Sequence, residues 1–308
     1  MSYVAPSSPL SIGGVLDNWM RLFSASFSRC WALALVAVAV TAAGQFLVTP
    51  VLPQPHQNPL VYLQHTFSMV RAAGLLYIVS GLIGLVVYGA LLAQQVAVMR
   101  GSSPLSFADA LGRGLRRLPR MLLAAVLMLL ILAAVCLPMG LGVAALVSAR
   151  DAGHASVSLT LGVILGSLAL TLVVIYLSVR LEFWLPALFV EDCGGAAALG
   201  HSWRLVKGHW WRVTMINFVA LIILLIVGMA INWIAALVGG VFGLHAIDAL
   251  ADPAQFIRRM RVVSAIAATA SLVTLPLLTA MWLAIYHDLK LRREGGDLAA
   301  RAEALSGT

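Results

Sequence analysis

Residues 121–147 read MLLAAVLMLLILAAVCLPMGLGVAALV, a run without a single charged side chain. A helix needs about 20 apolar residues to cross the hydrocarbon core of a bilayer. The run is too long and too uniformly apolar for the alternating strands of an outer-membrane barrel. It therefore predicts a transmembrane helix.

Five further apolar runs accompany this one, at residues 31–48, 72–99, 157–179, 213–240 and 262–286. The composition agrees, because 61% of the 308 residues are hydrophobic, 10% are charged and the mean hydropathy is +0.98. So few charged side chains cannot coat a water-soluble globule of this size. We predict an all-α polytopic membrane protein with six transmembrane helices. A single integral membrane domain covers residues 1–308, and residues 287–308 form a cytoplasmic tail.

The basic residues predict the orientation of the spans. With the N-terminus inside, only five of the 20 Lys and Arg residues fall on the outer side: Arg71, Arg150, Arg258, Arg259 and Arg261. The other 15 fall at cytoplasmic ends, where basic residues resist translocation. We therefore expect a multi-pass protein of the bacterial cytoplasmic (inner) membrane with both termini in the cytoplasm. Because orientation explains the net charge of +8, nucleic acid is not expected as a partner.

Three short amphipathic stretches each precede a pair of spans and resemble one another. In each stretch a leucine precedes an arginine by five positions, the pairs being Leu16 and Arg21, Leu111 and Arg116, and Leu199 and Arg204. Apolar side chains recur at helical spacing opposite these basic residues. Ser106 with Asp109 predicts a capping box at the start of the second stretch. We predict three repeats of an amphipathic interfacial helix plus a transmembrane hairpin, at about 10–99, 104–180 and 193–286.

Basic amphipathic helices lie among lipid headgroups, where each basic residue attracts anionic lipid by about 1 kcal/mol. The candidates for binding lipid or a partner are Arg21, Arg113, Arg116, Arg117, Arg180, Trp203, Arg204 and Lys207. The candidates for a structural polar network are Glu182, Glu191, Asp192 and Asp288. In this network we expect Arg180 and Arg204 to anchor Glu191 and Asp288.

The fourth run continues almost without polar residues to residue 190. If wholly helical it would measure about 50 Å, against a bilayer core of about 30 Å. Arg180 and Glu182 therefore lie either at the cytoplasmic interface or inside the bundle. Arg180 is expected to cover Trp184, one turn further on. Pro186 is expected to bend the chain to the surface, so that Glu191 and Asp192 begin the third amphipathic helix.

No pattern of catalytic residues, metal ligands or cofactor-binding loops occurs, so an enzyme is the least supported class, and no cofactor is expected. We predict a non-catalytic protein whose basic cytoplasmic face organises anionic lipid or docks a partner. The alternative is a transporter or channel for a small or amphiphilic solute, since Pro138 and Pro276 interrupt two spans. Gly162 and Gly166 permit close helix contact within the bundle or in a homo-oligomer.

Two stretches carry a family resemblance. Residues 176–213 read YLSVRLEFWLPALFVEDCGGAAALGHSWRLVKGHWWRV, and residues 286–298 read YHDLKLRREGGDL. They resemble the membrane domain attached to some glycerophosphoryl diester phosphodiesterases and its stand-alone YciC-like inner-membrane relatives, with a looser similarity over most of the chain. The resemblance implies a multi-helix membrane fold rather than an activity. No catalytic residue is carried over, and His287 stands where a second tyrosine is usual.

Overall fold

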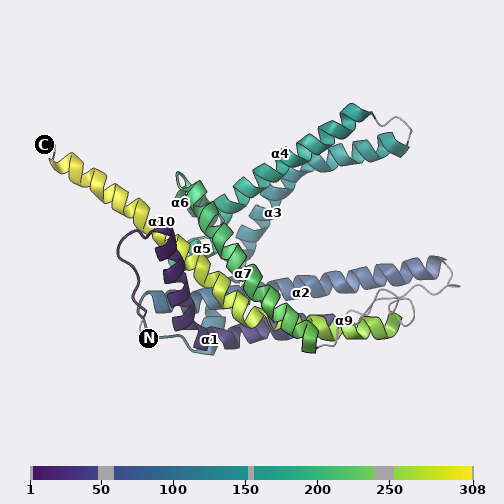
Figure 1. Ribbon diagram of the computed structural model, residues 1–308, viewed down its shortest axis with the longest axis horizontal. Helices are drawn as coiled ribbons and strands as arrows, with labels where there is room; N and C mark the ends of the chain where they lie inside the picture. Colours follow the sequence, from purple (N-terminus) through teal and green to yellow (C-terminus); the bar gives the residue numbers. More distant parts are fainter. Residues whose placement is uncertain (1–2, 48–58, 152–155, 239–252, 307–308) are drawn as a thin grey trace. The chain divides into compact units, whose positions relative to one another are not determined.

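The computed structural model describes residues 3–47, 59–151, 156–238 and 253–306, and these residues are helical with short connections (Figure 1). The helices are α1 (Ile12–Leu47), α2 (Pro59–Met99), α3 (Phe107–Asp151), α4 (Val157–Leu181), α5 (Trp184–Val190), α6 (Gly195–Val206), α7 (Trp210–Val238), α9 (Pro253–Ala268) and α10 (Ser271–Ser306).

Six of these segments are long and apolar enough to cross a membrane. They are Ile12–Gly44, Gly74–Met99, Phe107–Asp151, Val157–Val190, Trp210–Ile234 and Ser271–Gly295. Over the described residues, the prediction of an all-α fold with six helices of membrane-spanning length and hydropathy is confirmed. Each of these segments overlaps one of the six apolar runs. An apolar run in lipid must satisfy its backbone amides by hydrogen bonds within the segment itself, and a helix does this.

The first two amphipathic stretches are not separate helices, which corrects the predicted arrangement. Both run without a break into the following span, as α1 and α3, and Pro119 lies inside α3 without ending it. The capping box at the start of α3 is confirmed, since the Asp109 amide donates to Ser106 Oγ at 3.1 Å. Only the third stretch forms a helix of its own, α6, which ends before Gly208 at φ +86°. Glycine adopts this left-handed backbone without steric cost.

The fourth and sixth runs are interrupted at other places than predicted. The helix of the fourth run ends at Leu181, and Pro186 lies buried in the first turn of α5, where a missing amide hydrogen costs little. Glu191 and Asp192 therefore precede α6 rather than begin it. The sixth run is divided between α9 and α10 by a tight turn at Thr269 and Ala270, whose amides donate three residues back.

The chain forms two compact units, each described by itself below. The first unit comprises Met1–Pro6, Leu10–Leu118 and Asn217–Ala284, and the second comprises Ser7–Pro9, Pro119–Ile216 and Ile285–Thr308.

In the first unit α1 packs against α2 and α9. Its core contains the buried side chains of Cys30, Leu33, Val87, Ala90, Leu91 and Ala110. Two side chains also donate to consecutive carbonyls of α10. Trp19 Nε1 donates to Leu277 O at 2.7 Å, and Gln95 Nε2 donates to Pro276 O at 2.8 Å. Hydrogen bonds of this kind hold membrane helices together.

In the second unit α3 and α4 lie side by side as a hairpin, and α6 packs against α4 and α5 (Figure 1). Ser202 of α6 forms hydrogen bonds with backbone groups at the break between α4 and α5. Its hydroxyl donates to Arg180 O at 2.8 Å and accepts a hydrogen bond from the Phe183 amide at 3.0 Å. A Cβ at Gly195 would meet the Arg120 carbonyl and lie 2.9 Å from Ala124 N, so only glycine lets α6 approach α3 this closely. Backbone contact and hydrogen bonds thus position α6 beside the end of α4.

Candidate functional site

The guanidinium of Arg180, in the last turn of α4, lies between two aromatic rings. Its Cζ is 5.2 Å from the ring centroid of Tyr176 and 4.9 Å from that of Trp203 on α6. Nε and Nη2 donate to the Tyr176 hydroxyl at 3.1 and 2.8 Å, and Nη1 donates to Trp203 O at 3.1 Å. We call Arg180, Tyr176 and Trp203 the arginine clamp. Cation–π contacts and hydrogen bonds together fix the position of the charge.

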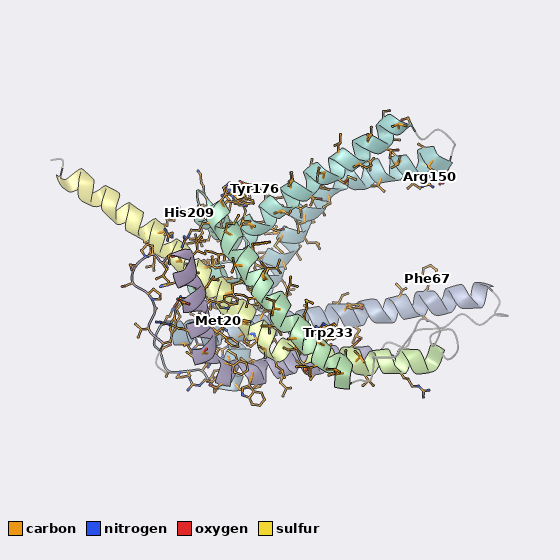
Figure 2. The ribbon with its side chains drawn as sticks, viewed as in Figure 1. Met20, Phe67, Arg150, Tyr176, His209 and Trp233 are labelled. Atoms are coloured by element: carbon orange, nitrogen blue, oxygen red, sulfur yellow. The ribbon has the colours of Figure 1, made fainter. Side chains whose placement is uncertain are left out.

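Further aromatic residues surround the clamp. Trp210 Nε1 donates to Tyr176 O at 3.4 Å, and the rings of these two residues lie 5.9 Å apart. The Trp211 ring lies 4.8 Å from that of Trp210, and its side chain is 70% exposed. Tryptophan and tyrosine gather where a membrane meets water. Figure 2 shows Tyr176 at the opposite end of the α3–α4 hairpin from Arg150, which the sequence assigns to the outer side.

The partners of Arg180 are neutral, which overturns the predicted network. Among the residues that the structure describes, the ion pairs of Glu191 and Asp288 involve other cations and do not include Arg180. The aromatic partner also differs from the prediction, since Trp184 packs against the core of Ala124, Leu181 and Leu199 instead. A guanidinium carries five N–H groups, of which the clamp uses three. Within the described parts of the chain, the other two N–H groups of Arg180 are left for a further acceptor.

Glu191 connects the two stretches that carry the family resemblance. Its Oε1 accepts from the Tyr286 hydroxyl at 2.9 Å and from Lys290 Nζ at 2.8 Å, both on α10. Partial burial raises the pKa of Glu191, but the hydrogen bonds from Lys290 and Tyr286 outweigh it, so the pKa lies below its usual value. The carboxylate is therefore charged at neutral pH and fastens α5 to α10.

Asp288 forms a second, more buried link. Its side chain is 1% exposed, and its Oδ2 accepts from Arg212 Nη2 and from Arg292 Nε, both at 3.1 Å. Asp192 pairs with Arg120 at 3.2 Å in an exposed position. Asp192 also has φ +50°, a backbone conformation that aspartate tolerates better than most residues. The ion pairs that the described structure gives Glu191, Asp192 and Asp288 are thus with basic residues other than the predicted Arg180 and Arg204.

The remaining candidates are on exposed or half-buried surface. The side chains of Arg21, Arg113, Arg116, Arg204 and Lys207 are exposed, whereas Arg117 and Glu182 are half-buried and make contacts of their own.

The sequence analysis did not identify four residues of these clusters: Tyr176, Arg212, Tyr286 and Lys290. The spacing of four residues between Tyr176 and Arg180 is a signal that could have revealed the first of these. The others depend on packing between distant segments. In the described parts of the chain, no three His, Cys, Asp or Glu side chains gather in a way that could hold a metal ion.

Comparisons with known proteins find no curated protein and no solved structure that matches the chain. A family model matches residues 156–295, a shorter part of the chain than the looser similarity over most of the chain had indicated. The matched range includes the arginine clamp, Glu191 and Asp288. Residues 156–295 match the family described as the membrane domain of glycerophosphoryl diester phosphodiesterase, which confirms the predicted resemblance for that part of the chain.

Proposed function

We propose that the protein is a non-catalytic protein of the bacterial inner membrane that binds anionic lipid through basic residues at the cytoplasmic ends of its helices. The observation that carries the proposal is the group of basic side chains at the helix ends that we assign to the cytoplasmic side, of which Arg180 in the arginine clamp has the most closely defined position. The clamp holds a positive charge at the end of a membrane helix among neutral partners, and in the described structure it leaves two N–H groups of the guanidinium for a further acceptor. A phosphate accepts two parallel hydrogen bonds from a guanidinium, which makes it a well-matched acceptor.

The distribution of acidic side chains supports the same proposal. Glu191 is engaged by Lys290 and Tyr286, and Asp288 is engaged by Arg212 and Arg292. These acids therefore do not neutralise the clamp. The exposed residues Arg113, Arg116, Arg204 and Lys207 add positive charge on segments that we assign to the cytoplasmic side. An anionic headgroup layer would compensate these charges.

We also infer the threefold repeat from the sequence register, in which Leu16, Leu111 and Leu199 align and each precedes an arginine by five positions. Two glycines of these stretches pack closely against a neighbouring helix, Gly114 against α2 and Gly195 against α3. Because Gly114 follows its leucine by three positions and Gly195 precedes its leucine by four, the two contacts are not equivalent, and the inference rests on the sequence register alone.

The test compares two variants that each lose three positive charges. The first carries Arg113→Gln, Arg116→Gln and Arg204→Gln on the proposed cytoplasmic side, and the matched control carries Arg71→Gln, Arg150→Gln and Arg258→Gln on the outer side. At about 1 kcal/mol per arginine, the first variant should lower the preference for phosphatidylglycerol over phosphatidylcholine about a hundredfold. Native mass spectrometry of the full chain from mixed-lipid nanodiscs measures the retained lipids. Equal lipid retention in the wild type and the first variant would overturn the proposal.

A second candidate function is transport, which one feature of the first unit favours. Gln94 is 1% exposed, and both polar atoms of its side chain are buried without a hydrogen-bond partner among the described residues. Gln95 beside it donates to the carbonyl of Pro276, a proline inside α10. Buried polar groups at membrane depth are often part of a solute path. Flux of small polar solutes into liposomes, lost on Gln94→Leu, would support this candidate.

A further inference from the structure

An apolar groove runs between α3 and α4 in the second unit. Its volume is about 600 Å³, and its walls include Pro138, Met139 and Gly142 of α3 and Gly162, Gly166 and Val173 of α4. A Cβ at Gly162 or Gly166 would meet nothing within 4 Å, so both glycines face open space. The groove is thus a cleft along the membrane-spanning part of the hairpin rather than a closely packed helix contact.

The groove lies on the face of α4 that leads to the arginine clamp. The α4 side of the groove is formed by residues at helical spacing: Leu159, Gly162, Val163, Gly166, Ala169, Leu170 and Val173. Continuing the same spacing by three and then four residues reaches Tyr176 and Arg180. Since α4 is one uninterrupted helix from Val157 to Leu181, the stripe that lines the groove ends at the fixed guanidinium.

The combination of an apolar cleft and a cation at its end matches an anionic amphiphile. At 1.5 Å per residue, Arg180 is about 10 Å from Val173 and about 21 Å from Gly166 along the helix axis. Half of a bilayer core is about 15 Å thick, and the headgroup layer adds roughly 5–7 Å. A lipid with its phosphate at Arg180 would therefore have the end of its acyl chain near Gly166.

We propose that this surface is a binding site for one anionic phospholipid of the cytoplasmic leaflet. Its phosphate accepts from the two remaining N–H groups of Arg180, and one acyl chain occupies the groove between Val173 and Gly166. The inference rests on the proposed function, because it assigns a particular site to the lipid. A helix from a second copy of the chain would fill the groove but would leave Arg180 without its acceptor, so the lipid is the better match.

The test uses the full chain in nanodiscs of phosphatidylglycerol and phosphatidylcholine, with a phosphatidylglycerol probe that carries a diazirine near the end of one acyl chain. Gly166→Leu fills the groove without touching the clamp, and Gly140→Leu is the matched control, since its Cβ also meets nothing within 4 Å and it does not line the groove. Photolabelling should map to the peptides that contain residues 135–142 and 166–173. Gly166→Leu should reduce this labelling about tenfold, and Gly140→Leu should leave it unchanged.

Two arginine variants test the headgroup. Arg180→Gln should reduce the retention of phosphatidylglycerol about tenfold in native mass spectrometry, and Arg180→Lys, which keeps the charge but not the paired donors, should retain an intermediate amount. Labelling of the groove that persists in Gly166→Leu, or crosslinks between the α4 helices of two chains in place of lipid, would overturn the site. If the variant lacking Arg113, Arg116 and Arg204 loses anionic lipid while Gly166→Leu and Arg180→Gln do not, this site is wrong and the proposed function stands. If all these variants keep their lipid, both are wrong.

Discussion

Replacing Asp288 with asparagine should destabilise the protein by about 3 kcal/mol, because it removes a buried charged acceptor that Arg212 and Arg292 share. The Asp288 side chain is 1% exposed, whereas the two arginine side chains are 20% and 26% exposed. Breaking a fully buried ion pair by removing one partner costs about 3–5 kcal/mol. We expect the lower end of that range, since water still reaches part of both guanidinium groups.

The measurement is thermal and denaturant unfolding of the purified chain in detergent, with Asp192→Asn as the matched control. The pair of Asp192 and Arg120 is 68% and 51% exposed, and such pairs contribute about 0–1 kcal/mol. Asparagine also tolerates the positive φ at this position. Combining Asp288→Asn with Arg212→Gln should cost less than the sum of the single changes, because each single change already breaks the ion pair between these two residues. Equal losses for Asp288→Asn and Asp192→Asn would refute the reasoning.

Three further predictions concern Glu191, two glycines of α6 and the orientation of the chain in the membrane. Because the pKa of Glu191 is lower in the folded chain than its ordinary 4.5, its contribution to stability is present above pH 4.5 and is lost as the pH falls through the folded value; unfolding curves of Glu191→Gln should lack this component. Gly195→Ala should destabilise the chain by at least about 1 kcal/mol through collision with the α3 backbone, whereas Gly200→Ala in the same helix, with open space at its Cβ, should stabilise it by up to about 1 kcal/mol; unfolding midpoints that rank the two variants the other way contradict the packing of α6. Reporter fusions at the two termini should both show cytoplasmic activity, and a periplasmic signal from either would disprove the predicted orientation.

The helices were predictable because their signals are local. Each apolar run is long enough to require a membrane helix by itself, and the capping pair of Ser106 and Asp109 lies within one helical turn. The breaks were less predictable. Pro186 was expected to bend the chain, yet α4 ends at Leu181, where Ser202 on a different helix supplies the hydrogen bonds that the break requires. A break stabilised from another segment leaves no signal in its own sequence.

The sequence alone determined the six long apolar helices that can span a membrane, because burying backbone polar groups in lipid leaves a long apolar run no alternative to a helix. Only the tertiary structure decided how the charges pair. Several aromatic and acidic residues lie near Arg180 in the sequence, and each was a possible partner. In the structure α6 packs against α4, and the guanidinium contacts the rings of Tyr176 and Trp203. The same packing of distant segments joined Glu191 to Lys290. A long basic side chain can reach many partners, so its choice depends on which helices meet rather than on spacing along the chain.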